Sequence, residues 1–137
     1  MEFTFVYIKP DAVSRKVAHD VLQDLLDNGI EILRIKVKKM SLEEAEKLYE
    51  MHKGKDFYEA LLKYVTSDKV VLMKAYGKNI VKRVREVIGA TDPSKAKEGT
   101  IRRKYGIGLK DGIIYNAIHA ADSIENAERE AKIFFEY

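Results

Sequence analysis

The sequence predicts an α+β protein with a ferredoxin-like split βαβ sandwich, in which helices pack on a four-stranded antiparallel sheet. Segments with strand character alternate with segments of helical spacing, in the order strand, helix, strand, helices, strand, helix, long loop, strand, helix. Four strands with helices between them suit one sheet with helices on one face, and the βαβ-like crossings are too few for a doubly wound sheet. Residues 1–137 contain no linker, repeat or low-complexity segment, so we expect a single domain.

The first part of the chain begins with a strand, a helix and a second strand. Phe3–Ile8 is rich in aromatic and β-branched residues and predicts a buried strand, which stops at Pro10 because proline has no N–H to donate. Val17–Asn28 has apolar residues at helical spacing. Ile30–Lys39 alternates apolar and charged residues, which predicts a strand with one exposed face.

Two helices and a third strand follow. Ser41, with Glu44 three residues later, predicts a capping box that opens a helix through about Met51. Asp56–Val65 has the spacing of a second, shorter helix, and Val70–Tyr76 predicts the third strand.

The last part of the chain is less regular. A helix begins after Asn79 and ends at Gly89, and Ala90–Gly112 predicts a long irregular loop that carries many cations. The apolar run Ile113–Ile118 predicts the fourth strand, and an amphipathic helix follows it.

Composition excludes several classes of protein. The 137 residues are 46% hydrophobic and 34% charged, with no apolar run long enough to cross a membrane and no signal-peptide pattern, so we expect a cytoplasmic protein. The absence of Cys rules out disulfides and thiolate metal sites. The formal net charge is only +3, so any anion binding must depend on local clusters of cations.

His119 is the strongest candidate for a reactive side chain. It follows the last apolar run and precedes Asp122, a common helix N-cap, and Glu125 would complete a capping box with Asp122. A histidine at such a strand-to-helix junction is held rigidly at a surface, and its neutral imidazole is a usable nucleophile. The other histidines, His19 and His52, lie alone on predicted helices, where we expect surface or edge positions.

Other side chains indicate what His119 would react with. Glu130 flanks the buried stripe of the last helix, and an imidazole N–H would satisfy this carboxylate while leaving the other ring nitrogen free. Lys9, Arg85 and Arg102 lie at element ends or in the long loop, and converging cations of this kind suit phosphate oxygens. Each of these cations is equally well explained as a solvated surface charge.

An apolar face for a nucleobase is also available in the sequence. Tyr49 and Phe57 could supply it, although core packing alone would explain both residues. The chain contains neither a G-x-x-x-x-G-K-[ST] nor a G-x-G-x-x-G phosphate loop, and no pair of histidines has metal-binding spacing.

Several motifs, taken in order, resemble those of the nucleoside diphosphate kinase family over essentially the whole chain. They are Ile8-Lys9-Pro10-Asp11-Ala12-Val13, Gly89-Ala90-Thr91-Asp92-Pro93, Gly99-Thr100-Ile101-Arg102, Asn116-Ala117-Ile118-His119 with Asp122-Ser123, and Ala127-Glu128-Arg129-Glu130. The first motif alone would be a weak signal, but the motifs together and in this order are specific.

The resemblance implies a ferredoxin-like fold, Mg²⁺ as cofactor, and ping-pong transfer of a γ-phosphoryl group from a nucleoside triphosphate to a nucleoside diphosphate. It implies that His119 becomes phosphohistidine, oriented by Glu130 and close to Tyr49. It also implies a homo-oligomer, with a hexamer favoured. The residues that it implies for the nucleotide are Phe57 and Leu61 for the base, Lys9, Arg85, Thr91 and Arg102 for the phosphates, and Asn116 for the ribose, with Lys9 also near the sugar hydroxyl.

The chain departs from the family pattern in several places. Ala121 stands where the family commonly has Ser, Glu98 replaces a usual Pro, and the stretch between Arg102 and Asn116 is longer than usual. These departures leave open the rate of phosphoryl transfer and the contact of Asn116 with the ribose. The alternative is a non-catalytic or weakened ferredoxin-like module that binds nucleotides or nucleic acid through the same basic loop. Neither a membrane nor an obligate nucleic-acid partner is expected.

Overall fold

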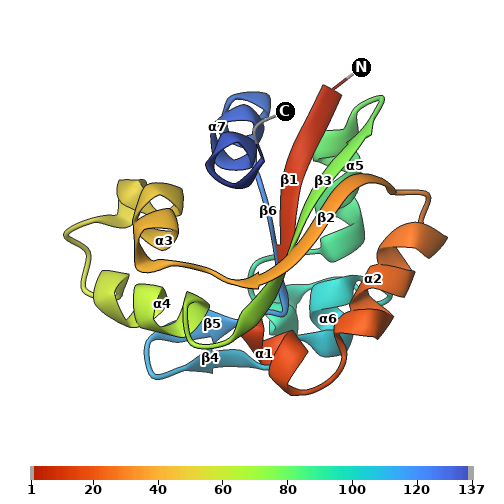
Figure 1. Cartoon of the computed structure of the whole chain (residues 1–137). Coiled ribbons are helices and arrows are strands. Elements are labelled where there is room, and N and C mark those ends of the chain that lie inside the picture. Colours follow the sequence, from red (N-terminus) through yellow and green to blue (C-terminus); the bar gives the residue numbers. More distant parts are fainter. Residues whose placement is uncertain (1, 136–137) are drawn as a thin grey trace.

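The computed structural model describes residues 2–135, and a four-stranded antiparallel sheet lies at its centre (Figure 1). In this sheet β1 pairs with β3 on one side and with β6 on the other, and β2 pairs with the far edge of β3. The order β2-β3-β1-β6 confirms the predicted ferredoxin-like arrangement. The strands span Glu2–Ile8 (β1), Glu31–Lys39 (β2), Lys69–Gly77 (β3) and Ile118–Ala120 (β6).

Seven α-helices lie in the described residues, together with two short 3₁₀ turns at Glu50–His52 and Pro93–Lys95. The one-turn helix at the end of β1 begins at Pro10, where we expected only a turn; proline fits the first helical position because that N–H is unpaired anyway. Within residues 2–135, every helix is too short or too polar to span a bilayer. The helices are Pro10–Ser14 (α1), Ala18–Asp27 (α2), Leu42–Leu48 (α3), Tyr58–Val65 (α4), Ile80–Ile88 (α5), Ile101–Tyr105 (α6) and Ile124–Phe134 (α7).

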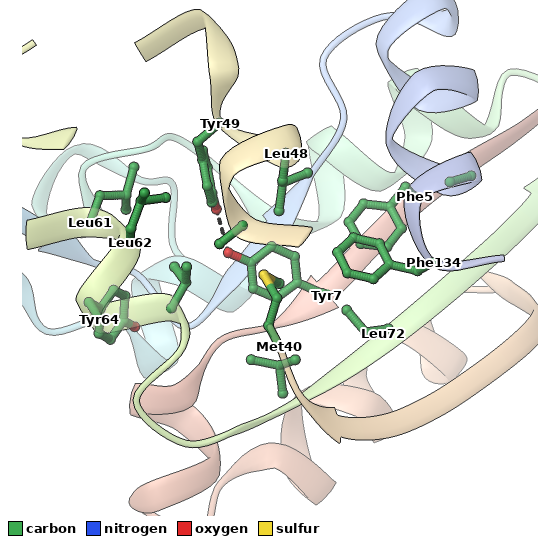
Figure 2. Close-up of a cluster of buried hydrophobic side chains, with 14 of the residues drawn as sticks. Phe5, Tyr7, Met40, Leu48, Tyr49, Leu61, Leu62, Tyr64, Leu72 and Phe134 are labelled. Carbon is green, nitrogen blue, oxygen red and sulfur yellow. Dashed lines mark hydrogen bonds between the residues drawn. The ribbon is translucent and has the colours of Figure 1, made fainter. Parts of the chain in front are cut away.

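The helices cover both faces of the sheet, so the expectation of one covered face was wrong (Figure 1). Successive side chains of β1 point to opposite faces, and from Thr4 to Ile8 they are fully buried on both. Tyr7 lies in a core with α3, α4 and α7, and Ile8 lies in a core with α2, α5 and α6. Figure 2 shows the first of these cores, in which the rings of Phe5 and Phe134 stack. A strand that is apolar on both sides needs a cover on each.

Capping interactions fix the starts of two helices. The Ser41 hydroxyl accepts from the Glu44 N–H at 3.1 Å, and the Glu44 carboxylate accepts from the Ser41 N–H at 2.9 Å, so the predicted capping box opens α3. In α7 the N-cap is Ser123, whose hydroxyl accepts from the Asn126 N–H at 3.1 Å. The expected cap at Asp122 was therefore wrong by one residue.

The segment Ala90–Gly112, expected to be an irregular loop, contains regular structure. It holds α6 and a short strand, Gly108–Lys110 (β4), which pairs with Ile113–Tyr115 (β5) in a separate two-stranded hairpin. Between these strands Asp111 and Gly112 both have positive φ, at +53° and +79°. Two such residues are typical of a type I′ hairpin turn, for which Asp-Gly is a preferred sequence.

The apolar run 113–118 is consequently not one strand. Its first half forms β5 in the hairpin, and its end forms β6 in the main sheet. A tight turn separates them: Ala117 has φ +72°, and the Ile118 N–H donates to the Asn116 carbonyl at 2.9 Å. This turn redirects the chain into the strand that carries residue 119.

Strand β2 is the end strand of the sheet, and its apolar side is exposed. Leu33, Ile35 and Val37 are 48%, 52% and 61% exposed, although the alternating pattern predicted that one face of this strand would be buried. Periodicity shows which residues share a face, but it does not show whether a helix of the same chain reaches that face.

Candidate active site

One cavity of about 510 Å³ contains every residue that the sequence singled out for the site. Helices α3 to α7, strands β4, β5 and β6, the residue that follows β1 and segments between these elements supply its walls. The sequence-predicted residues that line it are Lys9, Tyr49, Phe57, Leu61, Arg85, Thr91, Arg102, Asn116, His119 and Glu130.

His119 is held by a buried carboxylate. It lies in β6, directly opposite Tyr7 of β1, and its Nε2–H donates to Oε1 of Glu130 at 2.7 Å. Glu130 comes from α7 and is only 4% exposed. No group among residues 2–135 forms a hydrogen bond with Nδ1 of His119. The bond to Glu130 therefore fixes the tautomer that leaves the Nδ1 lone pair available.

The surroundings keep this imidazole neutral. Burial lowers the pKa of His119 below its usual value of 6.5, although the hydrogen bond and charge of Glu130 act in the opposite direction. The nearby charges of Lys9 and Arg102 lower the same pKa further. The ring is therefore unprotonated on Nδ1 at neutral pH, which is the form that can act as a nucleophile.

Aromatic rings of two elements confine the imidazole. The Tyr7 ring lies 5.2 Å from it between centroids, and those of Phe5 and Tyr49 each lie 6.1 Å away. The hydroxyls of Tyr7 and Tyr49 hydrogen-bond to each other, as the dashed line in Figure 2 marks. Burial raises the pKa of both phenols, so both stay neutral. Tyr7 was not predicted as a site residue, because its sequence context indicates only a buried strand.

Two arginines hold the strand of His119 on either side of it. The guanidinium of Arg102 donates to the Ile118 carbonyl at 2.9 Å and to the Gly89 carbonyl at 3.0 Å. Arg85 donates to the Ala120 carbonyl at 3.3 Å. These bonds use backbone oxygens and not carboxylates, so the positive charge of both side chains remains available to an anion.

The cavity concentrates positive charge in a place that is poorly solvated. Lys9 is 8% exposed and Arg102 is 4% exposed. Burial and the nearby Arg102 lower the pKa of Lys9 to about 8, and burial and Arg85 lower the pKa of Arg102 to about 10. Such shifts indicate that the cations lack enough negative charge around them, and a polyanion bound in the cavity would supply it.

Part of the cavity wall is apolar. Leu61 of α4, Phe57 just before α4, and Met51 line it, and the last two are 36% and 48% exposed. His52 also lines it, 5.2 Å from the Phe57 ring and 6.2 Å from the Tyr49 ring between centroids. The expectation that His52 is only a surface or edge residue was incomplete, because a single helical position does not reveal which cavity it borders.

Thr91 and Asn116 also line the cavity. The Asn116 amide nitrogen donates to the Thr91 carbonyl at 2.9 Å. Its amide oxygen is buried and has no hydrogen-bond partner among residues 2–135. A buried acceptor of this kind is costly unless a donor reaches it.

Arg129 and Asp122 are two further charged residues at the site. The Arg129 guanidinium lies 3.5 Å from the second carboxylate oxygen of Glu130. Asp122 borders the cavity and accepts from the Asn126 side chain at 2.7 Å, a bond that lowers the pKa of the Asp122 carboxyl. Residues 2–135 contain no cluster of three or more His, Asp or Glu side chains that could hold a metal ion by themselves.

Comparison with known proteins gives consistent matches. A family model described as nucleoside diphosphate kinase matches residues 2–137. A nucleoside diphosphate kinase of Kosmotoga olearia is 47% identical over 136 residues, which are 99% of this chain and 90% of that protein. One of Methanocaldococcus jannaschii is 46% identical over 134 residues, 98% of this chain and 93% of that protein. The crystal structure of the Aquifex aeolicus nucleoside diphosphate kinase matches with a TM-score of 0.89 at 33% identity, covering 98% of this chain and 94% of that one.

Proposed function

The chain belongs to the nucleoside diphosphate kinase family, and from that premise we propose a ping-pong phosphotransferase whose reacting atom is Nδ1 of His119. The observation that supports this most strongly is the pairing of His119 Nε2 with Glu130 at 2.7 Å in a cavity lined by buried cations. This pairing leaves one neutral ring nitrogen free to attack an anionic substrate.

In the first half-reaction, the Nδ1 lone pair attacks the γ-phosphorus of a nucleoside triphosphate. The bond from that phosphorus to the β–γ bridging oxygen breaks, and the nucleoside diphosphate leaves with the electron pair. The imidazole then carries phosphate on Nδ1 and a proton on Nε2, and the Glu130 carboxylate stabilises its positive charge. In the second half-reaction a β-phosphate oxygen of another nucleoside diphosphate attacks the same phosphorus and restores the free histidine.

The cations bind and orient the phosphates. Lys9, Arg85, Thr91 and Arg102 all line the cavity in which the phosphates would bind. Phosphoryl transfer needs in-line positioning and charge neutralisation more than any other help. Because the two arginines are fixed to carbonyls beside His119, they stay in position when the nucleotide leaves.

Mg²⁺ is proposed as the cofactor, held mainly by the nucleotide's own phosphate oxygens. The protein's contribution would be the Asp122 carboxylate, since the other carboxylate of the cavity, Glu130, is engaged with His119. When bound, the ion would shield the phosphate charges from one another.

The nucleoside would occupy the other end of the cavity. Phe57 and Leu61 would hold the base by apolar contact, and the unpaired oxygen of Asn116 would accept from a ribose hydroxyl. Every base has a π-face, so a contact of this kind tolerates all of them and predicts broad nucleotide specificity. Tyr49 would stay close to the histidine through its ring contact.

We also propose a homo-oligomer, with a hexamer favoured, and a cytoplasmic location. The exposed apolar side chains of β2 support self-association, because a stripe of such residues on an end strand needs a cover.

Phosphoryl transfer through the protein tests the proposal. With γ-³²P-labelled ATP, the wild-type chain should take up an acid-labile label and pass it to added GDP. His119→Ala should take up no label, and His19→Ala, which alters an exposed histidine on α2, should behave as wild type. Label on His119→Ala, or nucleotide binding with no label on the wild type, would contradict the proposal. The second outcome would favour a non-catalytic nucleotide-binding module.

A further inference from the structure

Tyr7 carries a hydroxyl into the core beside the reacting histidine, and the reaction proposed above does not use it. Tyr7 lies in β1, directly opposite His119 in the strand register, and its side chain has no exposed surface. Its neighbours in the same core, Phe5 and Leu72, are purely apolar. A buried hydroxyl is costly unless it is hydrogen-bonded, so its presence at this position needs an explanation beyond packing.

The Tyr7 hydroxyl has a single hydrogen-bond partner. It bonds to the hydroxyl of Tyr49, the residue that follows α3, and neither hydroxyl bonds to any other group among residues 2–135 (Figure 2). Each phenol has one proton to donate and can also accept a bond. Two phenols that share one bond therefore leave one of their two protons without an acceptor among those residues.

Burial decides which of the two protons is left over. Burial raises the pKa of both phenols, so each keeps its proton. If Tyr49 donated, the unpaired proton would be that of Tyr7, which is fully enclosed, and an enclosed donor without an acceptor is costly. If Tyr7 donates, the unpaired proton is that of Tyr49, which borders the cavity. The favoured bond therefore runs from the Tyr7 O–H to the Tyr49 oxygen.

The side chain of Tyr49 lies close to the charged residues of the site. Its ring is 6.1 Å from the imidazole of His119 between centroids. Apart from burial and the bond to Tyr7, the charges of Glu130 and Arg102 both shift the pKa of this phenol, in opposite directions. A proton that Tyr49 directs into the cavity is thus available to an anionic oxygen bound beside the histidine.

We propose that Tyr7 is a positioning residue, which donates to the Tyr49 hydroxyl and so turns the Tyr49 proton into the cavity. The proposal deepens the function proposed above and rests on it. During transfer, the Tyr49 O–H would donate to an oxygen of the phosphoryl group; no covalent bond forms at either phenol, and each proton stays on its own oxygen. A hydroxyl that accepts a bond also donates a stronger one, so Tyr7 makes Tyr49 a better donor.

Single-turnover uptake of label from γ-³²P-labelled ATP, measured by rapid quench at saturating ATP, tests this role. Tyr49→Phe should slow the uptake about tenfold, the size expected for losing a hydrogen bond to a charged oxygen. Tyr7→Phe should slow it about threefold, because Tyr49 keeps its proton but loses the bond that directs and strengthens it. The double variant should be no slower than Tyr49→Phe, because Tyr7 acts only through Tyr49.

ADP binding provides a readout that separates this role from a loss of structure. ADP has no γ-phosphoryl group, so its calorimetric affinity for Tyr7→Phe should stay within about twofold of wild type while the transfer rate falls. A general disturbance of the cavity would weaken ADP binding together with the rate, and that result would contradict the proposal.

Tyr64→Phe is the matched control. Tyr64 is also buried, at 8% exposed, and its hydroxyl donates to Asp11, but it borders a different cavity, which Arg15 and Lys110 also line. This variant loses a buried phenolic hydrogen bond, as Tyr7→Phe does. Its free energy of unfolding should therefore fall, whereas its rate of label uptake should equal that of the wild type.

Hydroxyl exchange in the wild type tests the direction of the bond without any substitution. With tyrosine ¹³C-labelled at Cζ, NMR reports how fast each hydroxyl proton exchanges with water. The Tyr7 proton should exchange slowly and the Tyr49 proton rapidly. A Tyr49 proton that exchanges as slowly as that of Tyr7 would overturn the proposed direction.

The kinetic outcomes separate this proposal from the proposed function. Label uptake at the wild-type rate in Tyr7→Phe would overturn the role of Tyr7 and leave phosphoryl transfer through His119 standing. A double variant slowed by the product of the two single effects would overturn it too, because Tyr7 would then act independently of Tyr49. A wild-type chain that takes up no label would defeat both proposals.

Discussion

Lys9, Arg102 and His119 all have pKa values shifted by burial and by nearby cations. Lys9 and Arg102 lower the pKa of the imidazole, Arg102 lowers that of Lys9, and Arg85 lowers that of Arg102. The arrangement is unfavourable for the ligand-free protein and becomes favourable when phosphate charge enters. Such a conflict between stability and binding is common where catalytic groups are buried together.

The charge states predict a pH profile. Phosphate binding needs Lys9 protonated, and its pKa of about 8 means that the amine loses its charge as pH rises through that value. The nucleophile needs neutral His119, whose pKa lies below 6.5. Values of kcat/KM report the free enzyme, so kcat/KM should be level near neutrality, fall in acid below pH 6.5 and fall above about pH 8.

Lys9→Arg provides the control for the fall of kcat/KM at alkaline pH. A guanidinium keeps its positive charge between pH 7 and pH 10, so this holds even when the variant has a lower kcat/KM than the wild type. Its kcat/KM should lose the fall that begins near pH 8. A wild-type profile that stays level to pH 9.5, or the same alkaline fall in both proteins, would show that Lys9 does not control phosphate binding.

The junction between α5 and α6 positions Arg102 through a close backbone approach. Gly89, at the end of α5, has φ +88°, and a Cβ there would lie 2.5 Å from Oγ1 of Thr100 at the start of α6. The Gly89 carbonyl also accepts from Arg102. Any side chain at this position would push apart the two helix ends that hold the arginine.

Gly89→Ala and Gly99→Ala form a matched pair that isolates this contact. Both glycines have φ near +88°, but a Cβ at Gly99 meets nothing within 4 Å. Both variants should lose about 1–2 kcal/mol of unfolding free energy from backbone strain. Gly89→Ala should lose about 1–3 kcal/mol more from overpacking and should raise KM. Urea unfolding measures the difference, and equal losses would mean that Thr100 moves aside freely.

Elements with strong local signals were predictable, and those set by distant partners were not. The Ser41–Glu44 capping box depends on neighbouring residues only, and it was found correctly. The split of run 113–118 depends on pairing with β4 and β1, which apolar character alone cannot reveal. Asp111-Gly112 is a recognisable hairpin signal, but it lies in a segment whose glycines and cations are typical of a loop.

The candidate site joins segments from almost the full length of the chain, from Lys9 to α7. Its reactive and charged residues could be predicted because they sit in recognisable motifs, as His119 and Arg102 do. Tyr7, His52 and Leu109 could not, since each has an ordinary local pattern and reaches the cavity only through packing between distant elements. Motifs therefore predict the reactive residues, whereas the residues that shape the cavity are known only from the fold.

The apolar side of β2 predicts assembly in solution. Ile35, in the middle of this end strand, is 52% exposed, and Leu33 and Val37 flank it with similar exposure. Light scattering after size exclusion should give a mass several times the 15.7 kDa of one chain. Ile35→Lys should lower that mass, because a charge cannot be buried there without a partner.

Leu26→Lys is the control for this change. Leu26 lies on α2 and is 48% exposed. Leu26→Lys therefore also replaces an exposed apolar side chain with a charged one, but on a different surface. It should leave the mass unchanged. A monomeric wild type, or an Ile35→Lys variant with the wild-type mass, would show that the β2 stripe does not join protomers.

The mechanism depends on which nitrogen of His119 carries the phosphoryl group, because Glu130 holds Nε2 and leaves Nδ1 free. Nitrogen-15 and phosphorus NMR of the ATP-phosphorylated protein, labelled at histidine, distinguishes the two isomers directly. We predict a single phosphohistidine with the phosphorus bonded to Nδ1 of residue 119. Phosphorus on Nε2, or on any other residue, would contradict the account.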